Sequence, residues 1–133
     1  MIVSSSDNRS TIRHLSPVLF VADRQKTLEY YSSIGFYCDF GLGFVERDGV
    51  VIIFHETENK DRITPNYPHH REDALDIFAL VYGVEELYHE LAEKGAKLHK
   101  PLEVNEFGMK EFSIIDPDGY TIGFGSRSRI RVS

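Results

Sequence analysis

The chain has 133 residues, with 15 Lys and Arg against 21 Asp and Glu, so its formal net charge is −6 at pH 7 with His neutral. This length predicts a single domain. Hydrophobic and aromatic contents of 41% and 12% predict a packed core rather than a disordered chain. The acidic balance argues against a nucleic-acid-binding surface, because affinity for phosphates comes from Lys and Arg. We therefore expect a small-molecule partner and no nucleic acid.

The cysteine content and the hydropathy of the chain indicate the cellular compartment that we expect for the protein. Cys38 is the only cysteine, so no intrachain disulfide can form and a reducing compartment is predicted. The apolar runs, such as residues 17–22 and 50–54, are much shorter than the ~20 residues of a membrane helix. Residues 1–13 are polar and lack the apolar stretch of a secretory signal. We expect a cytoplasmic protein with no membrane partner.

The first half of the chain predicts a strand, a helix and three more strands. The apolar run 17–22 precedes Asp23, which stands at a helix N-cap position. Apolar residues then recur at helical spacing up to Gly35, a residue type that commonly ends helices. Three further strands are predicted within residues 35–40, 41–48 and 49–56, with Gly49 as a turn residue.

The second half predicts the same order after a polar segment, residues 57–73, that contains two prolines and no periodicity. An apolar strand, a helix ending at Gly95, and further strands are expected. They are assigned to residues 75–81, 83–95, 96–100, 111–116 and 120–125, with a connection through Pro101 and a turn at residues 116–119.

The two halves repeat at an offset of 60 residues. The matching pairs are Val21 with Val81, Gly35 with Gly95, and Phe54 with Ile114. A repeat of this length predicts an internal duplication. The expected fold is α+β, with two tandem βαβββ modules: module one spans about residues 12–56, the loop 57–73, and module two about 74–126.

This order resembles the glyoxalase, bleomycin-resistance and dioxygenase superfamily, also called the vicinal oxygen chelate fold. The resemblance rests on the segment from Ser16 to Phe36 and on GMKEFSIIDPDGY, residues 108–120. Within the superfamily the chain looks most like the bleomycin resistance proteins, because of GFYCDF, GVEELYHEL and the aromatic Phe107 before Gly108. The resemblance implies that modules of two chains pair in a homodimer and enclose a ligand cleft.

Metal-dependent members of this superfamily bind a divalent ion at four positions, which fall here on Ser16, Ile53, Asp76 and Gly123. Ile53 and Gly123 have no donor side chain and Ser16 is a poor ligand. We therefore expect no metal and no other cofactor. A shifted site from His14, His55 and Asp76 is the alternative, because His14 shares a strand face with Ser16 and His55 with Ile53.

A cleft without a metal would hold its ligand through aromatic and acidic groups. Resemblance to the drug-binding members places Asp39, Phe40 and Phe107 in the cleft, and strand parity adds Phe20 and Phe78. His55 completes the expected ligand-binding set. Each phenylalanine is also a candidate core residue, and Phe107 stands where the relatives have Trp.

Two functions follow from these residues. The favoured one is a metal-free binding protein that sequesters a planar or cationic drug-like molecule, as bleomycin resistance proteins do. The alternative is a lyase, isomerase or dioxygenase of the superfamily, either metal-dependent or using His55 or Asp76 as a general base. The sequence contains no other catalytic motif, and catalytic residues stay unassigned.

Overall fold

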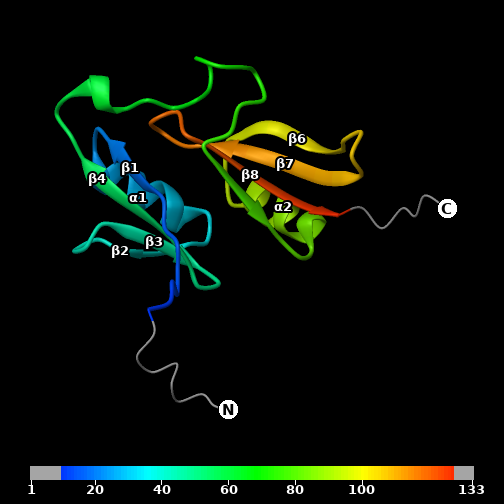
Figure 1. Ribbon diagram of the computed structural model, residues 1–133, viewed down its shortest axis with the longest axis horizontal. Helices are drawn as coiled ribbons and strands as arrows, with labels where there is room; N and C mark the ends of the chain where they lie inside the picture. The colour runs from blue at the N-terminus through cyan, green and yellow to red at the C-terminus, as the bar shows by residue number, and fades with distance from the viewer. Residues whose placement is uncertain (1–9, 128–133) are drawn as a thin grey trace, which may run out of the picture.

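The structure is a computed structural model that describes residues 10–127. It contains two modules that lie side by side and are joined by the loop 57–73 (Figure 1). Within the described residues, no helix is long and apolar enough to span a membrane.

Each module contains one strand, one helix and three more strands. Module one comprises β1 (Val18–Val21), α1 (Arg24–Ser33), β2 (Tyr37–Asp39), β3 (Phe44–Arg47) and β4 (Val50–Glu56). The loop carries a short 3-10 helix, η2 (Lys60–Arg62). Module two comprises β5 (Ile77–Leu80), α2 (Val84–Glu93), β6 (Leu98–Val104), β7 (Met109–Ile115) and β8 (Thr121–Arg127). The predicted α+β fold of two tandem βαβββ modules is confirmed.

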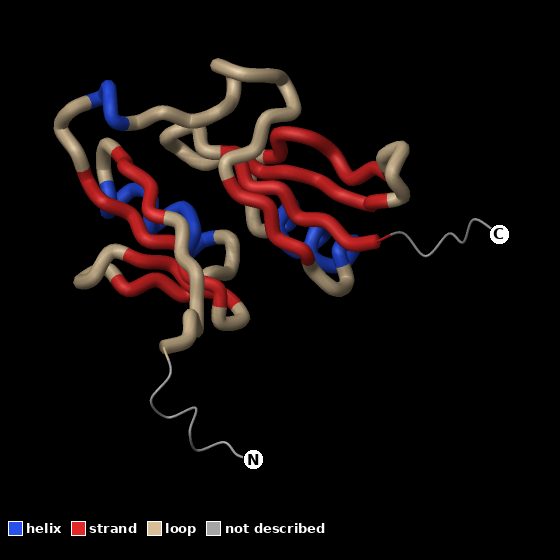
Figure 2. The backbone as a smooth tube through the Cα atoms, in the orientation of Figure 1, coloured by secondary structure: helices blue, strands red, loops and turns tan. Residues whose placement is uncertain are grey.

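Each module forms one four-stranded sheet, with the orders β1-β4-β3-β2 and β5-β8-β7-β6. The first strand pairs in parallel with the last one, β1 with β4 and β5 with β8, and all other pairs are antiparallel. The helix of each module lies behind its sheet (Figure 2). One face of each sheet is therefore covered by a helix, and the other is not.

Helix α1 begins and ends where the sequence predicts. The Asp23 carboxylate accepts a hydrogen bond from the backbone N–H of Lys26 at 3.1 Å, which satisfies a donor of the first turn. Gly35 follows the helix with φ +104°, a conformation that side chains with a Cβ rarely adopt. Between these ends, Leu28 and Tyr31 are fully buried against the sheet, and the Tyr31 ring stacks on Phe54 at 5.4 Å.

The offset of 60 residues holds only as far as the second helix. Val18 pairs with Ile53 as Phe78 pairs with Gly123, so Ile53 and Gly123 are equivalent although they differ by 123 − 53 = 70. The predicted match of Phe54 with Ile114 is therefore wrong, since Phe54 lies on β4 and Ile114 on β7. The causes are longer strands and a longer turn in module two: β6 has seven residues where β2 has three, β7 has seven where β3 has four, and the turn before β8 is longer than the one before β4.

Strand β6 also corrects the expected connection at Pro101, because the strand runs through this proline. β6 is at the edge of its sheet, where the missing N–H of proline costs no ladder bond. Irregular pairing with β7 around Lys100 accommodates it.

Polar contacts join the two modules. The Tyr31 hydroxyl donates to the Asp116 carboxylate at 2.9 Å, and the Tyr120 hydroxyl donates to the carbonyl of Phe20 at 2.6 Å. Arg47 on β3 forms a bidentate pair with Glu90 on α2, with both N–O distances at 2.8 Å. Tyr31, Asp116 and Tyr120 are buried, so the contact between the two modules includes parts of their cores.

Candidate ligand-binding site

The face of each sheet opposite its helix is called here the open face. Residues directly opposite each other on paired strands share a face, so the strand register gives its composition. The open face of module one consists of residues that are mainly aromatic, acidic or β-branched: Val18, Phe20, Tyr37, Asp39, Phe44, Glu46, Val51, Ile53 and His55.

The open face of module two carries smaller side chains at its centre. Register places on it Phe78, Leu80, Lys100, Glu111, Ser113, Gly123 and Gly125. Where module one has Phe44, Ile53 and His55, module two has Ser113, Gly123 and Gly125. The two faces therefore differ in shape at equivalent positions.

Two of the predicted ligand residues, Phe20 and His55, are neighbours on the open face of module one. Their rings meet edge to face with centroids 5.9 Å apart. The Arg62 guanidinium from η2 lies 5.8 Å from the Phe20 ring centroid, within reach of a cation–π contact. The loop between the modules thus contacts this face.

Phe78 lies on the open face of module two and is 45% exposed. Its ring covers Gly123 and Gly125, because a Cβ built on these glycines would stand 3.2 Å and 2.9 Å from the Phe78 ring. Leu75 approaches the same position of Gly123. Phe78 therefore fills the depression left by the two glycines.

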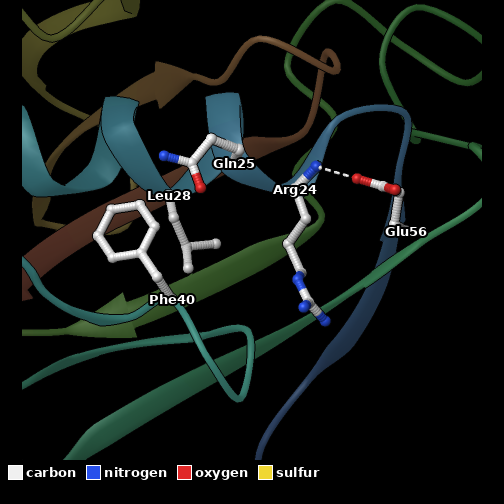
Figure 3. Close-up of a pocket in the computed structure, with 5 residues that line it drawn as sticks. All are labelled: Arg24, Gln25, Leu28, Phe40 and Glu56. Carbon is white, nitrogen blue, oxygen red and sulfur yellow. Dashed lines mark hydrogen bonds between the residues drawn. The ribbon is translucent and has the colours of Figure 1, made fainter.

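Asp39 and Phe40 stand at the turn after β2. The Asp39 carboxylate accepts the backbone N–H of Leu42 at 2.8 Å and so stabilises this turn. The Phe40 ring turns toward α1 and lines a small pocket of about 150 Å³ together with Arg24, Gln25, Leu28 and Glu56 (Figure 3). None of the other predicted ligand residues lines this pocket.

Phe107 lies in the turn between β6 and β7 and is 81% exposed. The Asn105 side chain orders this turn, since its oxygen accepts the N–H groups of Phe107 and Met109 at 2.9 Å and 3.0 Å. The turn projects at the end of module two that lies away from module one (Figure 1). One chain therefore does not gather Phe107 and the module-one residues around a single cavity.

A larger hollow, which the sequence did not reveal, lies between the modules. It is a mostly apolar groove of about 730 Å³ with Phe36 and Val50 from module one and Leu80, Tyr82 and Leu87 from module two among its lining. The Arg47–Glu90 ion pair also lines it. Leu87 lies on the apolar stripe of α2, and nothing in helical periodicity distinguishes a stripe that faces the core from one that borders a groove between modules.

The positions that bind metal in related proteins carry few donors in this structure. Ile53 and Gly123 occupy equivalent places on β4 and β8 and contribute no ligand atom. The Asp76 carboxylate accepts the backbone N–H groups of Asn66 and Thr121, both at 2.9 Å. Among residues 10–127, no three His, Cys, Asp or Glu side chains lie close enough to hold an ion, so the His14–His55–Asp76 set does not form.

Cys38 is a half-buried thiol on β2 whose sulfur lies 3.3 Å from the carbonyl oxygen of Leu28. Burial raises its pKa to about 11. The thiol is therefore protonated at neutral pH and is a weak nucleophile.

A family model described as the Glyoxalase/Bleomycin resistance protein/Dioxygenase superfamily matches residues 11–124. The chain therefore belongs to this superfamily, as the sequence resemblance implied. A comparison with curated proteins finds no match.

Several solved structures have a similar fold. A glyoxalase/bleomycin resistance protein/dioxygenase from Alicyclobacillus acidocaldarius is 16% identical, with a TM-score of 0.66 over 90% of this chain and 94% of that one. TioX from Micromonospora sp. ML1 is 15% identical, with a TM-score of 0.64 over 86% and 98%. A protein of unknown function from Agrobacterium tumefaciens is 26% identical, with a TM-score of 0.58 over 90% and 97%. The first two likenesses show the fold alone.

Proposed function

We propose that this member of the glyoxalase superfamily is a metal-free small-molecule binding protein that sequesters a planar, cationic or amphipathic ligand, as bleomycin resistance proteins do. The observation that carries the proposal is the chemistry of the open faces. The positions equivalent to metal ligands hold Ile53 and Gly123, and Asp76 is engaged by backbone N–H groups. Aromatic rings remain on both faces, and Asp39 and Glu46 add carboxylates on module one.

These side chains suit a flat or positively charged ligand. An aromatic face attracts a cation or stacks on a planar ring, and each such contact contributes about 0.5 to 2 kcal/mol when water is excluded. A carboxylate adds a charge-assisted hydrogen bond to a cationic group. Phe20 and Phe78 are the rings best placed for this role, because each lies on an open face and is partly exposed.

We further propose that the ligand cleft is completed in a homodimer, where module one of one chain faces module two of another. Two observations support this arrangement. The predicted ligand residues are divided between the two modules and do not converge within one chain. In addition, β1 and β5 are edge strands with exposed apolar side chains on them or just beyond them: Val18 on β1 is 47% exposed, Leu80 on β5 is 73% exposed, and Tyr82, two residues after β5, is fully exposed. Edges of this kind are normally covered.

Calorimetric titration tests the binding proposal. Bleomycin-type drugs are titrated first, followed by cationic and neutral planar aromatics, into wild type and Phe107→Ala. We expect dissociation constants below millimolar for at least one compound, and a loss of about 2- to 30-fold in Phe107→Ala, which follows from the free energy of one aromatic contact. Val104→Ala, at the exposed end of β6, is the matched control and should bind as wild type does.

Three outcomes would contradict the proposal. The first is the absence of binding across the whole panel. The second is an unchanged affinity in Phe107→Ala, which would contradict the placement of Phe107 in a cleft shared by two chains. The third is recovery of a chemically altered ligand, which would favour the enzyme hypothesis.

A further inference from the structure

Ser113 on β7 carries a buried hydroxyl without a hydrogen-bond partner. The residue is 3% exposed, and within residues 10–127 its Oγ is the only buried side-chain nitrogen or oxygen atom that lacks one. A hydroxyl removed from water without a partner destabilises the folded protein. Such atoms are rare in native proteins, and each one calls for a physical explanation.

The position of Ser113 is central on the open face of module two. It pairs with Lys100 on one side and with Gly123 on the other, and Gly123 pairs in turn with Phe78. Residues paired in this way point to the same face, so the hydroxyl shares the face with the Phe78 ring. Phe112 and Ile114, the neighbours of Ser113 in sequence, are buried in the core on the opposite face.

Next to Ser113, Gly123 and Gly125 leave a part of the sheet without side chains, which we call the floor, and the Phe78 ring lies over it. A Cβ on Gly125 would lie 2.9 Å from Cζ of Phe78, and a Cβ on Gly123 would lie 2.6 Å from Cδ1 of Leu75. Neither glycine has the positive φ that would itself require glycine. A larger residue at either position would collide with the side chains of Phe78 or Leu75, which lie directly above the two glycines. This lack of space, and not the backbone conformation, explains the glycines.

Phe78 covers this floor but is not enclosed. It stays 45% exposed, although Phe112 and Phe124, the aromatic residues of the core beneath, are only 2% and 6% exposed. A ring that is 45% exposed has fewer neighbours to displace when it changes rotamer than a ring enclosed in the core. The equivalent floor of module one is occupied by Phe44, Ile53 and His55 and has no such depression.

We propose that Gly123, Gly125 and Ser113 form a slot for a planar aromatic ring, which Phe78 fills in the free protein and shares or vacates when a ligand binds. This inference rests on the proposed function and specifies its ligand. The Ser113 hydroxyl hydrogen-bonds to the polar edge of the bound ring. Lys100 and Glu111 leave the sheet on the same face, one as a donor and one as an acceptor. A nitrogen heterocycle with donor and acceptor atoms on its edge fits this surrounding better than a hydrocarbon.

The test compares two planar probes of similar size, 2-aminobenzimidazole and the hydrocarbon indane, by calorimetry and ligand-observed NMR. Full-length wild type, Ser113→Ala and Gly125→Ala are titrated, with Ser126→Ala on the helix side of β8 as the matched control. Wild type is expected to prefer 2-aminobenzimidazole. Ser113→Ala should weaken binding of this probe by roughly fivefold or more and leave indane unchanged, because one hydrogen bond is lost. Gly125→Ala should weaken both probes, since its methyl group enters the slot.

Thermal unfolding without ligand gives an independent readout. Ser113→Ala removes no hydrogen bond of the free protein, so its melting temperature should equal or exceed that of wild type. A lower melting temperature would show that the hydroxyl has a structural partner and would overturn the inference.

The failures of the slot and of the proposed function are distinguishable. If wild type binds either probe and the affinities of Ser113→Ala and Gly125→Ala match those of Ser126→Ala, the slot is wrong and the binding function stands. If wild type binds neither these probes nor any member of the drug and aromatic panel, both are wrong.

Discussion

Asp116 and Asp118, the two aspartates of the turn before β8, act as connectors between the modules. Asp116 accepts backbone N–H groups of Asp118 and Tyr120 through one oxygen and the Tyr31 hydroxyl through the other. Asp118 accepts the N–H of Ala22 and the Thr27 hydroxyl, both at 3.0 Å. The sequence DPDG predicts a turn, and the structure adds that its carboxylates fasten that turn to module one.

Burial of Asp116 makes the stability of the protein depend on pH. Desolvation raises the pKa of Asp116 to about 6 from its usual 3.8, although three hydrogen bonds oppose the shift. The folded protein therefore binds this proton more tightly than the unfolded chain does. The protonated carboxyl group of Asp116 contributes stability that is complete below pH 4 and is lost as the pH rises through 6. This loss lowers the free energy of unfolding by about 3 kcal/mol, which is the free energy that corresponds to the pKa shift from 3.8 to about 6.

Asp116→Asn should remove this part of the pH dependence, because the amide stays neutral and its oxygen can still accept the two backbone N–H groups. We expect the free energy of unfolding of the variant, relative to wild type, to increase between pH 4 and pH 6. Urea titrations at several pH values measure it, with exposed Asp61→Asn as control. Parallel pH profiles for Asp116→Asn and wild type would contradict the account.

Metal content is also decided by single residues. Ile53 and Gly123 have no donor atoms, and the Asp76 carboxylate already accepts two backbone N–H groups. We therefore predict much less than one Fe, Mn, Ni or Zn per chain in protein purified without a His tag. Elemental analysis that finds close to one ion per chain after dialysis would refute this prediction.

At the scale of elements, the sequence predicts a helix or strand correctly where its ends and spacing depend on residues that are close together in the chain. The Asp23 cap, the apolar spacing of α1 and the two glycines after the helices all predicted their elements, because each acts within a few residues. The match of Phe54 with Ile114 failed because β6 and β7 are both longer than β2 and β3. The lengths of β6 and β7 depend on their pairing with each other, which no local pattern of residues 96–104 reveals.

In the candidate site, too, local features could be predicted from the sequence and features that depend on packing could not. Strand parity was sufficient to place Phe20 and Phe78 on open faces, since alternation is a local property. The orientation of Phe40 toward α1 could not be predicted, because it depends on how the turn at residues 40–43 packs on the helix. The groove between the modules is formed by residues of both modules, so it depends on how the modules pack together and cannot be predicted from the sequence pattern of either one.

The ion pair between Arg47 on β3 and Glu90 on α2 is the contact between elements that mutation can test most directly. Hydrogen bonds from Arg47 and from Lys94 lower the pKa of Glu90 to about 2. A lowered carboxyl pKa contributes stability above its usual value of 4.5, and this contribution is lost as the pH falls toward 2. Glu90 is partly exposed, so solvent screening keeps its contribution near about 1 kcal/mol.

Glu90→Gln should therefore lower the free energy of unfolding by about 1 kcal/mol at pH 7. The difference from wild type should narrow as the pH falls from 4.5 toward 2, since wild-type Glu90 then becomes neutral too. Exposed Glu93→Gln on the same helix is the control. Chemical denaturation at pH 7 with no loss in Glu90→Gln would show that the ion pair does not stabilise the docking of the modules.

At the scale of the whole molecule, the free edges of β1 and β5 and the divided ligand residues predict a homodimer. Light scattering after size exclusion should give about twice the chain mass of 15.3 kDa at micromolar concentration. Leu80→Asp should shift the protein to monomer, because it places a charge on an exposed apolar edge. Leu42→Asp, of nearly equal exposure in the turn after β2, should stay dimeric. A monomeric wild type would contradict the shared cleft.

The central claim is that this superfamily member binds a planar ligand without a metal and without changing it. The most direct measurement is calorimetric titration of chelator-treated, full-length protein with the best compound of the aromatic panel, followed by mass spectrometry of the recovered ligand. We predict saturable binding tighter than millimolar with one site per chain, an affinity unaffected by added divalent ions, and a ligand of unchanged mass. Binding that appears only after a divalent ion is added, or a ligand of altered mass, would contradict the claim.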